Sequence, residues 1–340
     1  MYKIKTIIPG LKNVPSYISE LAFNPTGSIL GATFSQFDNN CGVLDNSVRL
    51  YDTKSTKIIK ELRNPLSQLS HPHAVLLTNK HIIVSNKGTS PNTLLTFKIK
   101  DNTNLPLDIY VTPFKKLNEA HSFAIFNQLL LVTYCEKMDK KGAIVSYQFD
   151  DNHGRIVKVL DILEDWFNDY GDAKGIAFDK KGSKIYITFG SDQLNIKGKI
   201  SWIIKRIISL GVFKARTTKN GIAVFAISSQ GKISKKPKEI YLFNNYPRFE
   251  NIHIVGNKCL LTDALNNTVY IFNLNDKNKF EKPLQRITQN LHFPHGGKMS
   301  PDGKTIAISN FGLKVKSGKF IQWGEYLNIR KDNIVIFKRN

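Results

Sequence analysis

The chain contains six similar sequence units, and one position is equivalent in all of them: the start of the first strand. Several of the residues at this position could do acid–base chemistry. At this shared position the units hold Ser19 or Glu20, His73, His121, Lys174, Glu250 and His295. A positioned imidazole or carboxylate can take a proton from water, and a lysine beside imidazoles can hold an anion. The predicted catalytic residues are His73, His121, His295 and Glu250; the predicted ligand-binding residues include Ser19 and Lys174. This set suits the opening of a small, acidic lactone.

A second set of polar residues lies where the second strands end, at Asn86, Glu136, Asp263 and Asn310. Asn86, Glu136 and Asn310 are predicted to help bind the ligand. Carboxylate and amide oxygens are the ligands that hard divalent cations prefer. Glu20 and Asp263, together with Asn310, are therefore candidates for holding a divalent cation on the axis, and no other cofactor is predicted.

A structural interpretation of the same residues stays open. Polar side chains on inner strands often bond backbone groups and water without doing any chemistry. His71 and His81, which flank the motif Pro72-His73, are expected to face solvent.

The elements that position these residues are visible as a repeat. A polar residue followed five positions later by an aromatic one, with an aliphatic run between, occurs six times. The copies begin at Asn46, Asn92, Gly142, Asn220, Asn267 and Asp332. Each copy predicts the third strand of a unit, because β-branched and aromatic residues favour strands.

Two further strands precede each copy, and most units add a fourth. In the stretch from Phe293 to Gly312, the segment Pro301-Asp302-Gly303 joins two strands through residues that favour a tight turn. The fourth strands are predicted at 57–62, 107–112, 156–163, 239–246 and 284–288. Four antiparallel strands repeated at about fifty residues are typical of a β-propeller blade.

The count of units predicts an all-β propeller of six four-stranded blades, forming a single domain over residues 1–340. The last unit ends after its third strand, and the strand Tyr2–Ile8 has no partner of its own. Pairing the two would close the ring and remove both free edges. Seven blades remain an alternative for a chain of this length.

Several motifs resemble those of the lactonase-type propellers, the phosphogluconolactonase-like family. They are Pro72-His73-Ala74-Val75, Pro294-His295-Gly296 and the phrase SPDGKTIAISN from Ser300. The resemblance implies a propeller that opens a sugar-derived lactone, although members of that family usually have seven blades. The gluconolactonase/regucalcin group, with six blades and a metal on the axis, is a weaker match in motif. A non-catalytic platform is the alternative, because propellers also serve as binding surfaces.

The composition constrains the partners and the compartment. The net charge of +22 favours anionic ligands, but no sequence motif for specific nucleic-acid recognition is present. Cys41, Cys135 and Cys259 are widely spaced and form no C-x-x-C motif, as expected in a reducing compartment. With no signal-peptide pattern and no run of eighteen apolar residues, the expected location is the cytoplasm.

A basic insertion at about 191–219 departs from the repeat. Within Asn195 to Arg216, isoleucines recur at helical spacing among lysines and arginines. We expect a helical or hairpin cap over the channel mouth, with its isoleucine face against the propeller. The alternatives are contact with a protein partner or with an anionic membrane surface.

Overall fold

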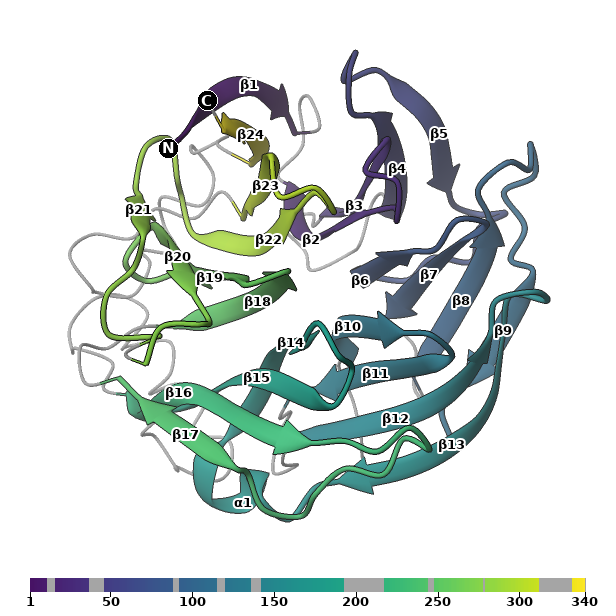
Figure 1. Cartoon of the computed structure of the whole chain (residues 1–340). Coiled ribbons are helices and arrows are strands. Elements are labelled where there is room, and N and C mark those ends of the chain that lie inside the picture. The colour runs from purple at the N-terminus through teal and green to yellow at the C-terminus, as the bar shows by residue number, and fades with distance from the viewer. Residues whose placement is uncertain are drawn as a thin grey trace, which may run out of the picture.

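The computed structural model describes residues 1–10, 16–36, 46–87, 92–114, 120–135, 142–192, 217–243, 248–277, 279–311 and 332–339. Six four-stranded antiparallel sheets are arranged around a central axis as the blades of a propeller (Figure 1). The prediction of an all-β propeller with six blades is confirmed.

The blades follow one another along the chain. The first contains β2 (Ser16–Phe23), β3 (Ile29–Gln36), β4 (Asn46–Asp52) and β5 (Ile58–Arg63). The second contains β6 (Pro72–Leu77), β7 (His81–Asn86), β8 (Thr93–Lys98) and β9 (Asp108–Val111). The third contains β10 (Ala120–Phe126), β11 (Leu129–Tyr134), β12 (Ala143–Asp150) and β13 (Arg155–Leu163).

After the short helix α1 (Phe167–Tyr170), the fourth blade contains β14 (Asp172–Phe178), β15 (Lys184–Asp192), β16 (Thr217–Ala226) and β17 (Glu239–Leu242). The fifth contains β18 (Phe249–Val255), β19 (Lys258–Asp263), β20 (Thr268–Asn273) and β21 (Gln285–Ile287). The sixth contains β22 (Pro294–Met299), β23 (Thr305–Asn310), β24 (Asn333–Arg339) and β1 (Tyr2–Pro9).

The N-terminal strand closes the ring as predicted. β1 pairs with β24 in antiparallel register, from Tyr2 opposite Arg339 to Pro9 opposite Asn333. The two ends of the chain therefore lie side by side in the sixth blade (Figure 1). This pairing gives both terminal strands a hydrogen-bonded neighbour.

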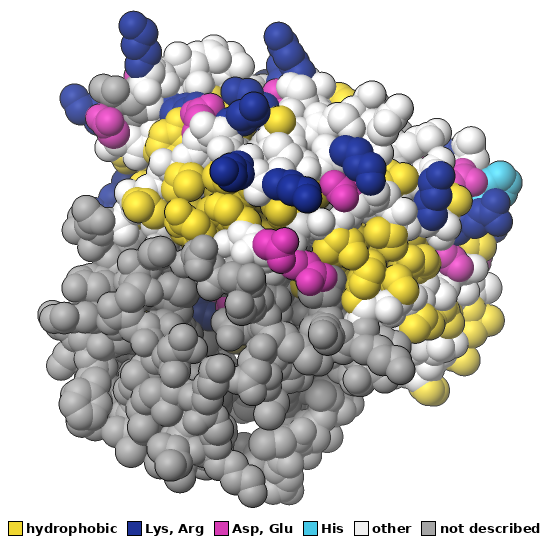
Figure 2. Space-filling model, turned by 90° about the horizontal axis from the view of Figure 1, so that it is seen from below, with side chains coloured by type: hydrophobic (Ala, Val, Ile, Leu, Met, Phe, Trp, Pro, Cys, Tyr) yellow, Lys and Arg dark blue, Asp and Glu magenta, His cyan; other side chains and the backbone are white. Residues whose placement is uncertain are grey.

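Hydrophobic side chains fill the space between neighbouring blades. All six residues of β7 and of β11 are buried, whereas β9 and β17 alternate between half-buried and exposed side chains. On the described part of the face seen in Figure 2, lysine and arginine side chains are spread out, with hydrophobic patches between them. The outermost strands of these blades are therefore less buried than the second strands.

Every innermost strand carries a β-bulge at the same place. The pairing register shifts between Ile18 and Leu21 in β2, and the corresponding shifts in the other inner strands surround His73, His121, Lys174, Glu250 and His295. A bulge re-aims side chains and breaks the usual alternation of a strand. Two consecutive residues of one inner strand can therefore both face the axis.

A hydroxyl on each second strand holds the bulge in place. It accepts a hydrogen bond of 2.7–3.1 Å from the backbone N–H one residue after the six shared positions. The hydroxyls belong to Thr33, Ser85, Thr133, Thr188, Thr262 and Ser309. The pattern makes Ser19, and not Glu20, the residue equivalent to His73.

Most of these hydroxyls also join neighbouring blades. Thr33 donates to the backbone oxygen of His73 in the next blade, and Thr262 donates to that of His295. Ser85, Thr133 and Ser309 likewise reach the backbone oxygens of Ala120, Lys174 and Ser19. We call these side chains the hydroxyl clasps; they fix the site-bearing backbone of one blade to the sheet before it.

Candidate functional site

Three imidazoles meet on the propeller axis. His73 from β6, His121 from β10 and His295 from β22 have ring centroids 4.5, 5.1 and 5.2 Å apart. Their exposed fractions are 3, 2 and 5%. Together with the carboxylate of Glu250 from β18, they form what we call the axial histidine cluster.

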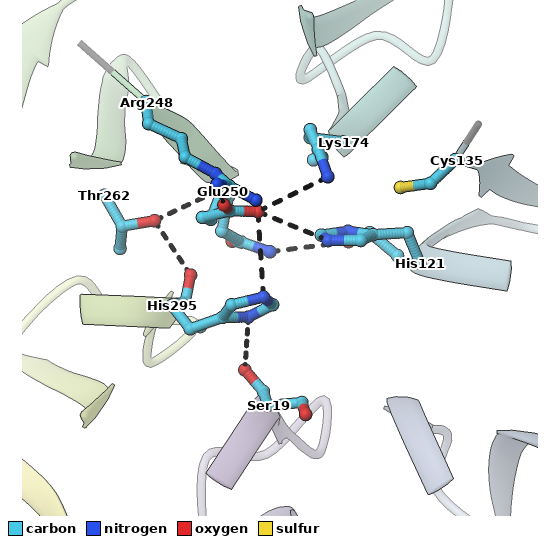
Figure 3. Close-up of polar contacts among 12 residues, drawn as sticks. Ser19, His121, Cys135, Lys174, Arg248, Glu250, Thr262 and His295 are labelled. Atoms are coloured by element: carbon cyan, nitrogen blue, oxygen red, sulfur yellow. Dashed lines mark hydrogen bonds and ion pairs between the residues drawn. The ribbon is translucent and has the colours of Figure 1, made fainter. Parts of the chain in front are cut away.

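Glu250 lies between cations and imidazoles contributed by several blades (Figure 3). Its Oε2 is 3.4 Å from His121 Nε2, 3.7 Å from His295 Nε2 and 3.9 Å from Lys174 Nζ. Its Oε1 accepts a hydrogen bond from Arg248 Nε. The shared positions of five blades are therefore brought together around one carboxylate and three imidazoles.

Hydrogen bonds orient two of the imidazoles. His73 Nδ1 lies 3.0 Å from the backbone oxygen of His121, and His295 Nδ1 lies 2.9 Å from that of Ser19. A carbonyl oxygen only accepts, so these contacts assign the proton of each neutral ring to Nδ1 and leave a lone pair on Nε2. Two nitrogen lone pairs are thereby presented within the cluster.

The environment sets the charge of each member. Burial lowers the pKa of all three imidazoles, that of His295 to about 4, so they are neutral at pH 7. Burial alone would raise the pKa of Glu250, but Arg248, Lys174 and His121 outweigh it and hold the pKa well below its ordinary value. The cluster thus combines neutral bases with one ionised carboxylate.

Lys174 connects the cluster to a second carboxylate. Its ammonium lies 3.5 Å from Asp172 Oδ2, and 14% of its side chain is exposed. Burial disfavours its charge, yet Cys135, Glu250 and Asp172 together raise the pKa of Lys174. The amine therefore stays protonated and can attract an anion toward the axis.

A second group of polar side chains on the inner strands, which we call the inner polar cluster, lies next to the shared positions. It consists of Glu20, Ser122, Asn251 and Lys298. Asn251 donates to Glu20 Oε1 and lies 3.4 Å from Ser122 Oγ, while Lys298 Nζ is 3.5 Å from Glu20 Oε2. Each of the first three residues directly follows a shared position, so the bulges place both clusters in the channel.

The predicted residues at the ends of the second strands bond to loops. Asn86 accepts from Ser70 N–H and donates to Gln68 O and Thr93 Oγ1. Asn310 bonds His292 N–H, Asn290 O and Asn333 Oδ1, while Asp263 accepts from Arg248 N–H and from Asn266. Glu136 lies outside the described residues.

The predicted hard-cation site does not form a cluster in the described part of the chain. Glu20 pairs with Lys298 and Asn251, whereas Asp263 and Asn310 bond to loops of their own blades. Of the described His, Cys, Asp and Glu residues, the group placed to hold a metal ion is His73, His121 and His295. Imidazole nitrogens prefer other metals than carboxylate oxygens do.

Sequence reasoning missed Arg248 and the hydroxyl clasps. Arg248 precedes β18, outside any strand, and nothing in the repeat singles it out. The clasps leave a signal that could have been read, because every second strand carries a Ser or Thr at the same place. The prediction that His81 faces solvent is wrong: the residue is 3% exposed, with Nδ1 3.1 Å from Asp151.

No protein-family model and no curated protein sequence matches the chain. Solved propellers do resemble its fold. The PQQ-bound aldose sugar dehydrogenase of Streptomyces coelicolor has a TM-score of 0.57 at 11% identity, covering 99% of this chain and 98% of that one. Hydrazine synthase of Kuenenia stuttgartiensis has a TM-score of 0.55 at 14% identity, over 89% and 94%.

The β-propeller domain of Myceliophteria thermophila Cps50 (Swd1) is similar too. Its TM-score is 0.51 at 11% identity, and the match covers 100% of both chains. At this level of identity the likeness extends to the fold alone. The function has to be argued from the site.

The predicted cap, Asn195 to Arg216, lies outside the described residues, although β15 and β16 extend toward it and pair as far as Asp192 opposite Thr217. No helix in the described ranges has the length and hydrophobicity needed to cross a membrane.

Proposed function

We propose that the protein is a hydrolase that opens a small, acidic lactone at the axial histidine cluster. The observation that carries the proposal is the meeting of His73, His121 and His295 on the axis. Glu250 Oε2 lies beside His121 and His295, and Lys174 and Arg248 lie against the same carboxylate. Proton acceptors, a fixed negative charge and cations are the groups that ester hydrolysis uses.

The chemistry follows from the state of each group. A water molecule attacks the lactone carbonyl while its proton passes to an imidazole lone pair, and the carbonyl oxygen becomes an oxyanion. When the intermediate collapses, the ring C–O bond breaks and the imidazolium returns the proton to the leaving alkoxide. The product is an open hydroxy acid, so the reaction consumes water and needs no oxidant or reductant.

The positive groups account for the predicted acidic substrate. Lys174 and Arg248 both border the cluster, and 28% of the Arg248 side chain is exposed. A carboxylate or phosphate on the substrate can approach these cations while the ester carbonyl reaches the imidazoles. The overall charge of +22 also raises the local concentration of anions around the protein, which favours an acidic substrate as well.

A panel of five- and six-membered lactones, with and without a carboxylate or phosphate, tests the proposal. Ring opening is followed by acid release at constant pH for the wild type and for the double variant His73→Ala/His295→Ala. General acid–base catalysis contributes about 100- to 10,000-fold, so the double variant should lose at least about 100-fold in kcat/KM. His153→Ala, which alters a side chain 70% exposed in the turn between β12 and β13, is the control.

Hydrolysis at the buffer rate for every lactone by the wild type would overturn the proposal. The non-catalytic platform, which uses the same face to bind a partner, would then take its place.

A further inference from the structure

We propose that His73, His121 and His295 bind a divalent transition-metal ion on the propeller axis, with zinc the best match to their donor atoms. The inference concerns the site of the proposed function and adds a cofactor to it. It does not depend on the identity of the substrate, because ion binding is measured without turnover.

The three donors are gathered from three blades. One ring nitrogen from each histidine lies within 4.8 Å of the others, and none of the three residues is more than 5% exposed. Zinc–nitrogen bonds of about 2.0–2.1 Å place tetrahedral ligands about 3.4 Å apart. Small rotations of the rings would therefore close the set around an ion.

The hydrogen bonds of the rings match those of metal-binding histidines. His73 and His295 each direct Nδ1–H at a backbone oxygen, which leaves Nε2 as a lone-pair donor. Backbone oxygens commonly fix the tautomer and orientation of metal ligands in this way. Ser309 donates to the backbone oxygen of Ser19, which supports the ring of His295, and Thr262 donates to the backbone oxygen of His295 itself. This ligand and its support are therefore both held by hydroxyl clasps.

Two atoms of the cluster lack a hydrogen bond. His121 Nδ1 and Glu250 Oε2 are buried, and neither has a hydrogen-bond partner among the described residues. A buried polar atom without a hydrogen bond carries a free-energy cost, which Lys174, 3.9 Å from Glu250 Oε2, offsets in part for the carboxylate but not for His121 Nδ1. Both atoms belong to residues of the cluster, so an ion or a molecule bound there would relieve the cost.

Acceptors also face acceptors in the cluster. Because Nδ1 of His295 carries the proton, its Nε2 lone pair lies 3.7 Å from the carboxylate oxygen Glu250 Oε2. Two acceptors repel unless a proton or a cation lies between them. A divalent ion at the meeting point would attract both atoms.

The donor types select the kind of ion. Imidazole nitrogens suit zinc and neighbouring transition metals, whereas magnesium and calcium prefer oxygen ligands. Three histidines also leave a fourth position for water, as in catalytic zinc sites. An ion there would occupy the imidazole lone pairs, so it would replace the imidazoles in activating water by making a bound water more acidic. Lys174 and Arg248 would favour an anion near the open position.

Zinc content and affinity test the inference. Untagged protein is stripped with a chelator, loaded with zinc chloride, desalted and analysed for metal, and zinc affinity is measured by titration calorimetry. We expect one zinc ion per wild-type chain. His73→Ala and His295→Ala should each weaken binding by at least about 100-fold, because changes to groups that merely support ligands already cost about 10- to 100-fold.

His153→Ala serves as the matched control and should bind like the wild type. Thermal unfolding with and without zinc gives a second readout: zinc should raise the Tm of the wild type and of His153→Ala but not of His73→Ala. A wild-type chain that retains no zinc, or retains it equally after His73→Ala, would overturn the inference. Lactone hydrolysis by chelator-treated, metal-free protein would also overturn a catalytic role for the ion while leaving the hydrolase proposal standing.

Discussion

Two buried glutamates on the propeller axis differ in charge. Glu250 and Glu20 are each 1% exposed, and each follows the start of an inner strand. Arg248, Lys174 and His121 outweigh burial at Glu250 and hold its pKa well below the ordinary value. At Glu20 burial outweighs Lys298 and Asn251 and raises the pKa to about 7.

The difference shows what distinguishes a reactive centre from its support in this fold. Paired carboxyl groups whose environments push their pKa values apart take different roles. Glu250 keeps a negative charge beside three neutral imidazoles, and we assign the chemistry to that level of the channel. Glu20 retains a proton up to neutral pH and joins the inner strands of blades one, five and six through Asn251 and Lys298.

The largest expected effect is on stability when the charge of Glu250 is removed. Glu250→Gln leaves Lys174 and Arg248 without their shared partner, and removing one side of a buried ion pair costs about 3–5 kcal/mol. Because Arg248 is partly exposed, we expect the lower end, about 3 kcal/mol, in urea unfolding at pH 6.

The matched substitution Glu20→Gln should not lower the free energy of unfolding at pH 6. The folded carboxyl group is mostly protonated there while the unfolded one is ionised, so the wild type loses stability on this account and glutamine does not. Equal losses in the two variants would contradict the assignment of opposite charges.

The next largest effect is expected in the pH dependence of stability, to which Glu20 contributes. The unfolded chain releases this proton near pH 4.5, while the folded protein keeps it to about pH 7. The contribution of Glu20 to the free energy of unfolding is therefore fully present below pH 4.5. It falls by about 3 kcal/mol as the pH rises to 7.

Unfolding free energies of the wild type and Glu20→Gln, measured from pH 4.5 to 7.5, give this effect as their difference. The buried histidines also contribute to the pH dependence: because their pKa values are lowered, they make the protein less stable as the pH falls. This contribution is the same in both proteins and cancels in the difference. A difference that stays constant over this range would show that Glu20 is ionised throughout.

A smaller effect is expected from the hydroxyl clasps. Thr262→Val keeps the shape of the side chain but leaves Asn251 N–H and the backbone oxygen of His295 without this partner. We expect a loss of about 1–3 kcal/mol in chemical denaturation. Thr262→Ser retains the hydroxyl, although it lacks the methyl group, and should be more stable than Thr262→Val. A Thr262→Val variant as stable as the wild type would contradict a stabilising role for the hydroxyl.

The fold could be predicted because every unit repeats the same pattern of apolar strands and turns. The pairing of Tyr2 with Arg339 followed from the last unit lacking a fourth strand. The histidines could be placed for the same reason, since equivalent positions of inner strands must meet at the axis.

The parts of the site that could not be predicted depend on local geometry. Regular strand alternation would turn Asn251 away from the axis, and only the bulge at Glu250 brings both side chains inward. Asn86 and Asn310 have the residue type of a ligand, yet they bond loops that precede the inner strands. Arg248 reaches Glu250 from outside the repeat.

The most direct test of the account is the hydrolysis rate of Glu250→Gln relative to Glu20→Gln, at pH 6, on the lactone that the wild type opens fastest. Both variants replace a buried axial carboxyl group by an amide, but only Glu250→Gln removes a negative charge at pH 6. We predict that Glu250→Gln loses at least about 100-fold in kcat/KM, while Glu20→Gln stays within about threefold of the wild type. Equal rates for the two variants, or a larger loss in Glu20→Gln, would contradict the placement of the chemistry at the axial histidine cluster.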